Sequence, residues 1–219
     1  MRSDRVAEGP VSKDIVFHEP GSPGEDALSE GSDRASAELQ MRIVRHCAPT
    51  LAGMKCGSMF RLKSDPHDIG ILIADIDRRL SDRGVRAETL RNDREGCLVY
   101  IYRPKILSSR MEDPAVCSIL ERYGYGSGDI RDVLDHLRHR FEHCPSIPPE
   151  VGVFLDYPAE DVIGYIENEG RCCKCVGCWK VYGDVAEAER RFQCFRKCRN
   201  VFIRRFEEGS HLERLTVRC

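Results

Sequence analysis

The sequence predicts an α/β or α+β fold in which a single mixed sheet is flanked by helices. Two observations predict it: short apolar runs typical of strands alternate with longer segments whose apolar residues recur at helical spacing. Leu98–Tyr102 and Val151–Leu155 show the first pattern. Asp65–Gly84 shows the second, with Gly84 as the expected helix end. The order of the strands does not follow from these patterns.

One globular domain is expected over residues 37–219, preceded by a disordered extension over residues 1–36. The extension is rich in Gly, Ser, Pro, Asp and Glu and has little apolar periodicity. It therefore cannot bury enough surface to offset the entropy lost on ordering. The apolar content of the whole chain, 41%, is ordinary for a soluble domain.

The remaining elements follow from spacing and from helix start and stop signals. A first helix is expected from Ala37 towards His46, with Pro49 marking its end or a turn, and Met54–Leu62 is a candidate strand. Pro104 prevents the extension of the strand at 98–102. The further expected helices are Pro114–Tyr123, Asp129–Phe141, Pro158–Glu167 and Asp184–Phe206, and the further expected strands are Trp179–Tyr182 and Leu212–Val217.

Charge and hydropathy exclude several classes of protein. The formal net charge of −2 arises from 34 basic and 36 acidic residues, so no global field attracts nucleic acid or an anionic membrane. The Arg-rich segment at 190–199 alternates with aromatic residues, but flanking glutamates favour a solvated face over an RNA-binding or acidic-protein-binding one. No apolar run approaches the ~18 residues of a membrane span, and no secretory signal is visible. We therefore expect a cytoplasmic protein.

Twelve cysteines are present, and six of them lie between Cys172 and Cys198. Without an export signal, clustered thiols favour metal or redox chemistry over disulfides. Two cysteine pairs have spacing compatible with a tetrahedral zinc site: Cys175, Cys178, Cys194 and Cys198. The structural alternative is a set of reduced cysteines that pack as small hydrophobes. An iron-sulfur site is a weaker option, because its usual ligand spacing is absent.

Seven further residues are candidates for ligand binding. His46 and Cys47 lie at a probable helix end, where imidazole and thiolate could ligate haem iron, although a structural role at the helix end is favoured. A Cys47 nucleophile activated by its neighbour is disfavoured, because no third orienting group is identifiable. The other candidates are two basic residues for a carboxylate or phosphate and three aromatic residues for a wall: Arg103, Lys180, Tyr157, Trp179 and Tyr182.

Four segments resemble an uncharacterised bacterial family catalogued as domain of unknown function 3793: His46–Gly53, Leu98–Pro104, Glu150–Ile166 and Cys172–Tyr182. Gly177 and the segment 179–182 match the family's constant motif better than the cysteines do, which weakens the case for an obligatory metal. Pro149 stands where the family commonly has a histidine, so no ligand role carries over to that position.

The resemblance implies occurrence in anaerobic bacteria and a flavodoxin-like partner. The leading hypothesis is a protein that binds a small ligand or cofactor, such as haem, in anaerobic redox or tetrapyrrole metabolism. The alternative is a non-enzymatic interaction module with a structural zinc held by the four cysteines. Whether the chain is an enzyme is left open, because no pair of nucleophile and base can be named.

Overall fold

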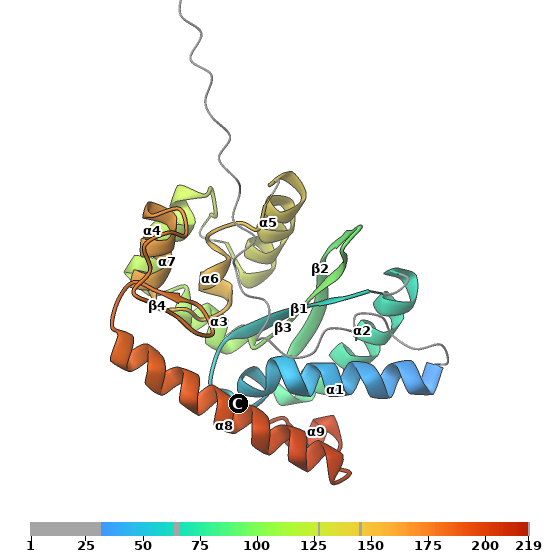
Figure 1. The fold of residues 1–219 in the computed structure, drawn as a ribbon. Coiled ribbons are helices and arrows are strands. Elements are labelled where there is room, and N and C mark those ends of the chain that lie inside the picture. The colour runs from blue at the N-terminus through green and yellow to red at the C-terminus, as the bar shows by residue number, and fades with distance from the viewer. Residues whose placement is uncertain (1–31, 64–65, 127, 145, 219) are drawn as a thin grey trace, which may run out of the picture.

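The computed structural model describes residues 32–63, 66–126, 128–144 and 146–218, which form an α+β fold with two separate antiparallel sheets (Figure 1). The helices are α1 (Ser32–Leu51), α2 (Pro66–Leu80), α3 (Pro104–Arg110), α4 (Pro114–Arg122), α5 (Ile130–His143), α6 (Val151–Phe154), α7 (Ala159–Glu167), α8 (Val185–Glu207) and α9 (Leu212–Leu215), with a 3-10 turn η1 at Ser81–Arg83. The strands are β1 (Gly57–Leu62), β2 (Arg86–Asp93), β3 (Gly96–Tyr102), β4 (Cys175–Val176) and β5 (Lys180–Val181).

The prediction of a single mixed sheet is wrong. The larger sheet has the order β1-β3-β2 and is antiparallel throughout, and β4 pairs only with β5. The expected strand at 151–155 is instead the helix α6 and the residue after it. A short apolar run that is buried all round suits a buried helical turn as well as a strand, so its pattern does not distinguish them.

The central strand β3 supplies two separate cores. Successive side chains of a strand point to opposite faces. Leu98, Tyr100 and Tyr102 therefore join one core with residues of α3 to α7, and Cys97, Val99 and Ile101 join the other with residues of α1, α2 and α9. The sheet is thus the middle of three layers (Figure 1).

β2 was not expected from the sequence. Most of its residues are polar, and its register against β3 shifts between Thr89 and Arg91. Such a bulge breaks the alternation by which strands are recognised. α3 was also not expected, although Pro104 occupies its first turn, a favourable place for proline.

α1 begins at Ser32, so residues 32–36 of the expected extension are helical. The rest of that expectation concerns residues 1–31, which lie outside the described residues. Pro49 does not end the helix, which continues to Leu51. A proline near the end of a helix costs only one backbone hydrogen bond, and Gly53 closes the turn at a φ of 74°.

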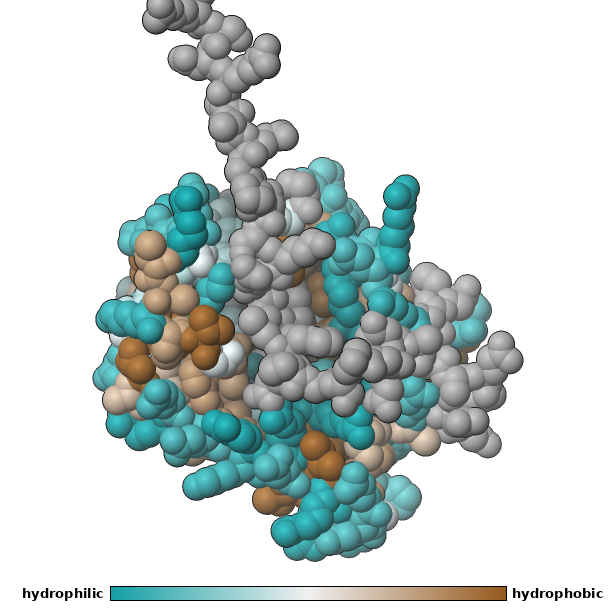
Figure 2. All heavy atoms as spheres, in the orientation of Figure 1, coloured by the Kyte–Doolittle hydropathy of each residue, from teal (hydrophilic) through white to brown (hydrophobic). Residues whose placement is uncertain are grey.

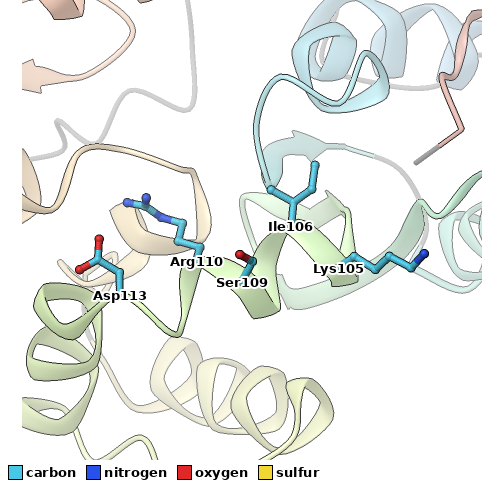
Figure 3. Close-up of a pocket in the computed structure, with 5 residues that line it drawn as sticks. All are labelled: Lys105, Ile106, Ser109, Arg110 and Asp113. Carbon is cyan, nitrogen blue, oxygen red and sulfur yellow. The ribbon is translucent and has the colours of Figure 1, made fainter.

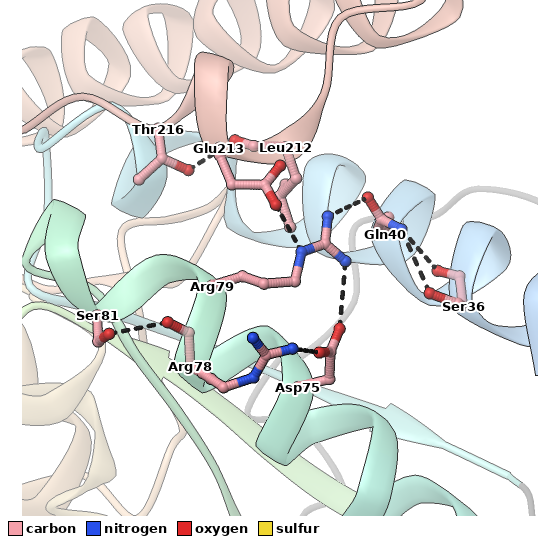
Figure 4. A network of polar contacts seen from close by, with 9 residues as sticks. All are labelled: Ser36, Gln40, Asp75, Arg78, Arg79, Ser81, Leu212, Glu213 and Thr216. Carbon is pink, nitrogen blue, oxygen red and sulfur yellow. Dashed lines mark hydrogen bonds and ion pairs between the residues drawn. The ribbon is translucent and has the colours of Figure 1, made fainter.

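The C-terminal segment folds back onto the layer formed by α1 and α2. Leu212–Val217 contains the helix α9 where a strand was expected. The Arg79 side chain of α2 donates to Glu213 of α9 at 2.5 Å and to Gln40 of α1 at 3.2 Å (Figure 4). The long helix α8 lies beside α1. None of the described helices is long and apolar enough to cross a membrane.

Candidate functional site

A buried carboxylate organises the edge around the only tryptophan. Asp161, in the first turn of α7, is 3% exposed. Its Oδ2 accepts a hydrogen bond from Trp179 Nε1 at 2.6 Å, and its Oδ1 accepts from the backbone N–H groups of Tyr182 and Gly183 at 2.7 and 2.8 Å. The carboxylate therefore fixes the β4–β5 ribbon against α7. This role is structural. It agrees with the position of Asp161 in the first turn of a helix, where a carboxylate complements the helix dipole.

Aromatic rings pack on both sides of Trp179. Tyr157 stacks on the indole with ring centroids 5.0 Å apart, and Phe192 of α8 meets it edge-on at 4.5 Å. Gly177 permits this packing, because a Cβ there would lie 2.1 Å from the Phe192 ring. Of the three predicted aromatic residues, Tyr157 and Trp179 are therefore in ring contact, and Tyr182 is joined to Trp179 only through the Asp161 carboxylate. Trp179 itself is only 3% exposed.

Next to this edge, Asp156 is held between two arginines. It connects α6 to α7 with a φ of 62°, a left-handed conformation that costs most residues energy and that Asp tolerates better than most. Arg110 of α3 approaches Asp156 Oδ1 at 3.3 Å, and Arg191 of α8 approaches Oδ2 at 3.2 Å. Arg110 also donates to the carbonyl of Val153 in α6, and Arg191 donates to the backbone carbonyl of Asp156 itself.

A lysine, Lys55, lies next to Asp156 and its two arginines. Lys55, in the loop between α1 and β1, places its Nζ 5.9 Å from the Tyr157 ring centroid and 5.7 Å from that of Phe195. Within the described residues, its ammonium has these ring contacts but no hydrogen bond or ion pair. Arg191 also lies over the Phe195 ring, at 5.7 Å. We call Lys55, Arg110, Asp156 and Arg191 the Asp156 cluster.

The electrostatics of the Asp156 cluster are unbalanced. Three basic side chains surround one carboxylate, so the cluster carries excess positive charge. Burial lowers the pKa of the Lys55 amine, and the neighbouring Cys56, Asp156 and Cys178 only partly oppose this effect. An anion placed here would stabilise the protonated lysine.

A hollow opens beside the cluster along α3. It measures about 460 Å³ and is lined by Lys105, Ile106, Ser109, Arg110 and Asp113 (Figure 3). Arg110 is common to the hollow and to the Asp156 cluster. The volume is within the range of small-molecule sites, and two of its five lining residues are basic. We call it the α3 hollow.

His46 and Cys47 do not belong to the Asp156 cluster and lie on α1. His46 stacks on Phe60 with centroids 5.4 Å apart, whereas Cys47 is fully buried in the core shared by α1, α2 and the sheet. Burial raises the pKa of the Cys47 thiol, which opposes the thiolate form that would ligate haem iron. The two side chains occupy different environments, as adjacent residues of a helix do.

Arg103 is buried and bound to the backbone. It is 1% exposed, and its guanidinium donates to the carbonyls of Thr50, Leu51 and Val217 at 2.6, 2.6 and 2.8 Å. These contacts cap the end of α1 and hold the C-terminal segment. Lys180, on β5, donates from Nζ to the carbonyl of Gly170 at 3.0 Å. Neither residue belongs to the Asp156 cluster.

The four cysteines of the expected zinc site are not gathered. Cys175 and Cys178 lie on the β4–β5 ribbon, and Cys194 and Cys198 lie on α8. No three of these sulfurs lie within 4.8 Å of one another. Burial raises the pKa values of Cys175, Cys178 and Cys198, the last to about 11, which favours the protonated thiol.

The basic residues of α8 are divided between internal and external contacts. Arg191 belongs to the Asp156 cluster, whereas Arg190 forms an ion pair with Glu187 on the same helix. Arg196 and Lys197 are exposed. On the face drawn in Figure 2, hydrophilic side chains cover most of the visible α8, in line with a solvated outer face.

The family model described as "Protein of unknown function (DUF3793)" matches residues 43–216. The chain belongs to this family. The matched range includes the Asp156 cluster, the residues of the α3 hollow and Trp179. No curated protein and no solved structure matches the chain.

In this DUF3793 protein, the cluster joins side chains that the sequence does not connect. Lys55 comes from a loop, Arg110 from α3, Asp156 from a turn and Arg191 from α8. Arg191 falls within the Arg-rich segment that the sequence shows at 190–199, whereas Lys55 and Arg110 were missed. No spacing or motif signals them, because only tertiary packing brings them together.

Proposed function

We propose that the protein binds a small anionic molecule at the Asp156 cluster, with the adjoining α3 hollow accommodating the rest of the ligand. One observation carries the proposal: Lys55, Arg110 and Arg191 lie around a single carboxylate, and the Lys55 ammonium makes no hydrogen bond or ion pair within the described residues. A half-buried cation without a directly bonded anion is costly. A carboxylate or phosphate beside Lys55 would offset that cost through a charge-assisted hydrogen bond.

The aromatic rings define the type of ligand further. Tyr157 and Phe195 flank the lysine, so a ligand with a planar ring next to its anionic group would contact both features. Haem, with its carboxylates, and flavin mononucleotide, with its phosphate, are of this kind. A role in tetrapyrrole or redox metabolism with a flavodoxin-like partner is the narrower form of the proposal, and it rests on the family resemblance.

Trp179 gives a direct optical test. It is the only tryptophan, it stacks on Tyr157, and the guanidinium of Arg191 lies 5.4 Å from its ring. We would titrate the reduced protein with haem and with flavin mononucleotide, following Trp179 fluorescence and ligand absorption. Binding at the cluster predicts saturation at one equivalent and at least tenfold weaker binding, about 1.4 kcal/mol, in Lys55→Gln.

The matched control is Lys197→Gln, which removes an exposed charge from α8 away from the cluster. It should leave both titrations unchanged. Binding of neither compound would remove the tetrapyrrole and flavin forms of the proposal. Equal weakening by both substitutions would contradict the assignment to the cluster.

A further inference from the structure

The last turn of α5 presents three side chains of metal-binding type on its exposed surface. The ligand atoms of His139, Glu142 and His143 all lie within 4.8 Å of one another. Residues three and four positions apart share one face of a helix, which explains their convergence. We propose that these three side chains form a binding site for a divalent transition-metal ion such as Zn²⁺, independent of the Asp156 cluster.

The backbone prepares one of the imidazoles for this role. His143 Nδ1 lies 2.9 Å from the carbonyl oxygen of His139. When Nδ1 carries the proton and donates to that carbonyl, the lone pair of Nε2 is left for a metal. Metal-binding histidines commonly have such a backbone partner, which fixes the tautomer and the orientation of the ring.

The other two ligand groups are available. Within the described part of the chain, the Glu142 carboxylate and the His139 ring nitrogens make no hydrogen bond or ion pair. His136, one turn earlier, differs because its Nε2 lies 2.9 Å from the carbonyl of Tyr123. The site therefore consists of three protein ligands, and water would complete the coordination of an exposed ion.

Position and ligand type both favour a transition metal. The carbonyl end of a helix carries partial negative charge, and His139 to His143 form the last turn of α5, so a cation is favoured there. The imidazole rings of His139 and His143 lie 4.0 Å apart between centroids, so both lie at the same end of the helix. Two imidazoles and one carboxylate suit Zn²⁺ better than Mg²⁺ or Ca²⁺.

Histidine footprinting tests the site in a chain rich in thiols. The reduced, untagged protein is acylated with diethyl pyrocarbonate at increasing zinc concentration, and modification of each histidine is read by mass spectrometry. We expect saturable protection of His139 and His143 and none of the exposed His211. Glu142→Gln should require about tenfold more zinc for the same protection. His139→Asn should remove the protection of His143.

All three ligands are exposed, so these variants should retain the fold, which circular dichroism would check. His211→Asn is the control and should leave the protection curve unchanged. Equal acylation of His139 and His143 with and without saturating zinc would overturn the proposal. Protection of His143 that persists unchanged in both His139→Asn and Glu142→Gln would also overturn it.

Discussion

The indole N–H of Trp179 donates to Asp161 Oδ2 at 2.6 Å, and this bond joins the β4–β5 ribbon to α7. The other carboxylate oxygen receives two backbone N–H groups of the segment that leads into α8. Asp161 therefore positions the ribbon, the tryptophan and the start of α8 together. The Asp156 cluster depends on this arrangement, because its member Arg191 belongs to α8 and Lys55 lies over the ring of Phe195, also in α8.

Asp161→Ala should lower the free energy of unfolding by about 3 kcal/mol, because three donors lose their acceptor in a buried place. Trp179 fluorescence should also change, since the indole loses its partner. Urea unfolding followed by circular dichroism measures the first effect. Glu167→Ala, at an exposed position of α7, is the control and should change the stability by less than about 0.5 kcal/mol.

Arg103→Lys should destabilise the protein nearly as much as Arg103→Ala, by about 3 kcal/mol. Lysine cannot reproduce the planar fork that reaches the carbonyls of Thr50, Leu51 and Val217 together. Thermal unfolding compares the two variants with Arg94→Ala, which removes an exposed arginine of the β2–β3 turn. Full stability of Arg103→Lys would show that the capping contacts contribute little.

Elements with a strong local period could be predicted from the sequence. The helices α2, α4, α5, α7 and α8 and the strand β3 were expected within a few residues of their bounds. The α+β class was one of the two predicted and is confirmed. Val151–Leu155 shows the limit of this reasoning, because its apolar run has no period. The edge strand β2 shows another, because its mostly polar residues lack the alternation by which a strand is recognised.

The candidate site was predicted only in part, for a physical reason. Tyr157 and Trp179 stack on each other, and Tyr182 is linked to Trp179 only through its backbone N–H, which shares the Asp161 carboxylate. Lys55 and Arg110 are single charged residues without a motif, and they reach the cluster through tertiary packing alone. Arg103 stands in a matching motif, yet its surroundings are backbone carbonyls, which sequence patterns do not reveal.

Stability should fall with rising pH in alkaline solution, in part through Cys56. Burial raises the pKa of its thiol from an ordinary value of 9.0 to about 12. Between these values the folded chain keeps a proton that the unfolded chain has released, so this contribution to stability is complete below pH 9 and is lost as the pH rises towards 12.

Cys56→Ser removes the titrating group while keeping a donor for the carbonyl of Phe154. The loss of unfolding free energy between pH 9 and 11 should therefore be smaller in this variant, by up to about 1.4 kcal/mol for each pH unit. Urea unfolding in reducing buffer at pH 8, 9, 10 and 11 measures both slopes. Identical slopes would contradict a raised pKa at Cys56.

Ligand binding should also depend on pH through Lys55. Burial lowers the pKa of its amine, and an anion favours the charged form, so binding should take up protons wherever the free lysine is partly neutral. The affinity for an anion should therefore fall as the pH rises through the Lys55 pKa, and this fall should be smaller in Lys55→Gln. Calorimetry in two buffers of different ionisation enthalpy would detect the proton uptake.

The most direct measurement of the central claim is a calorimetric titration of the reduced protein with inorganic pyrophosphate at low salt, with Lys55→Gln and Lys197→Gln in parallel. Binding at the Asp156 cluster predicts saturation at one equivalent, at least about tenfold weaker binding in Lys55→Gln and unchanged binding in Lys197→Gln. Absence of saturable binding, or equal affinities in all three proteins, would contradict an anion site at Lys55.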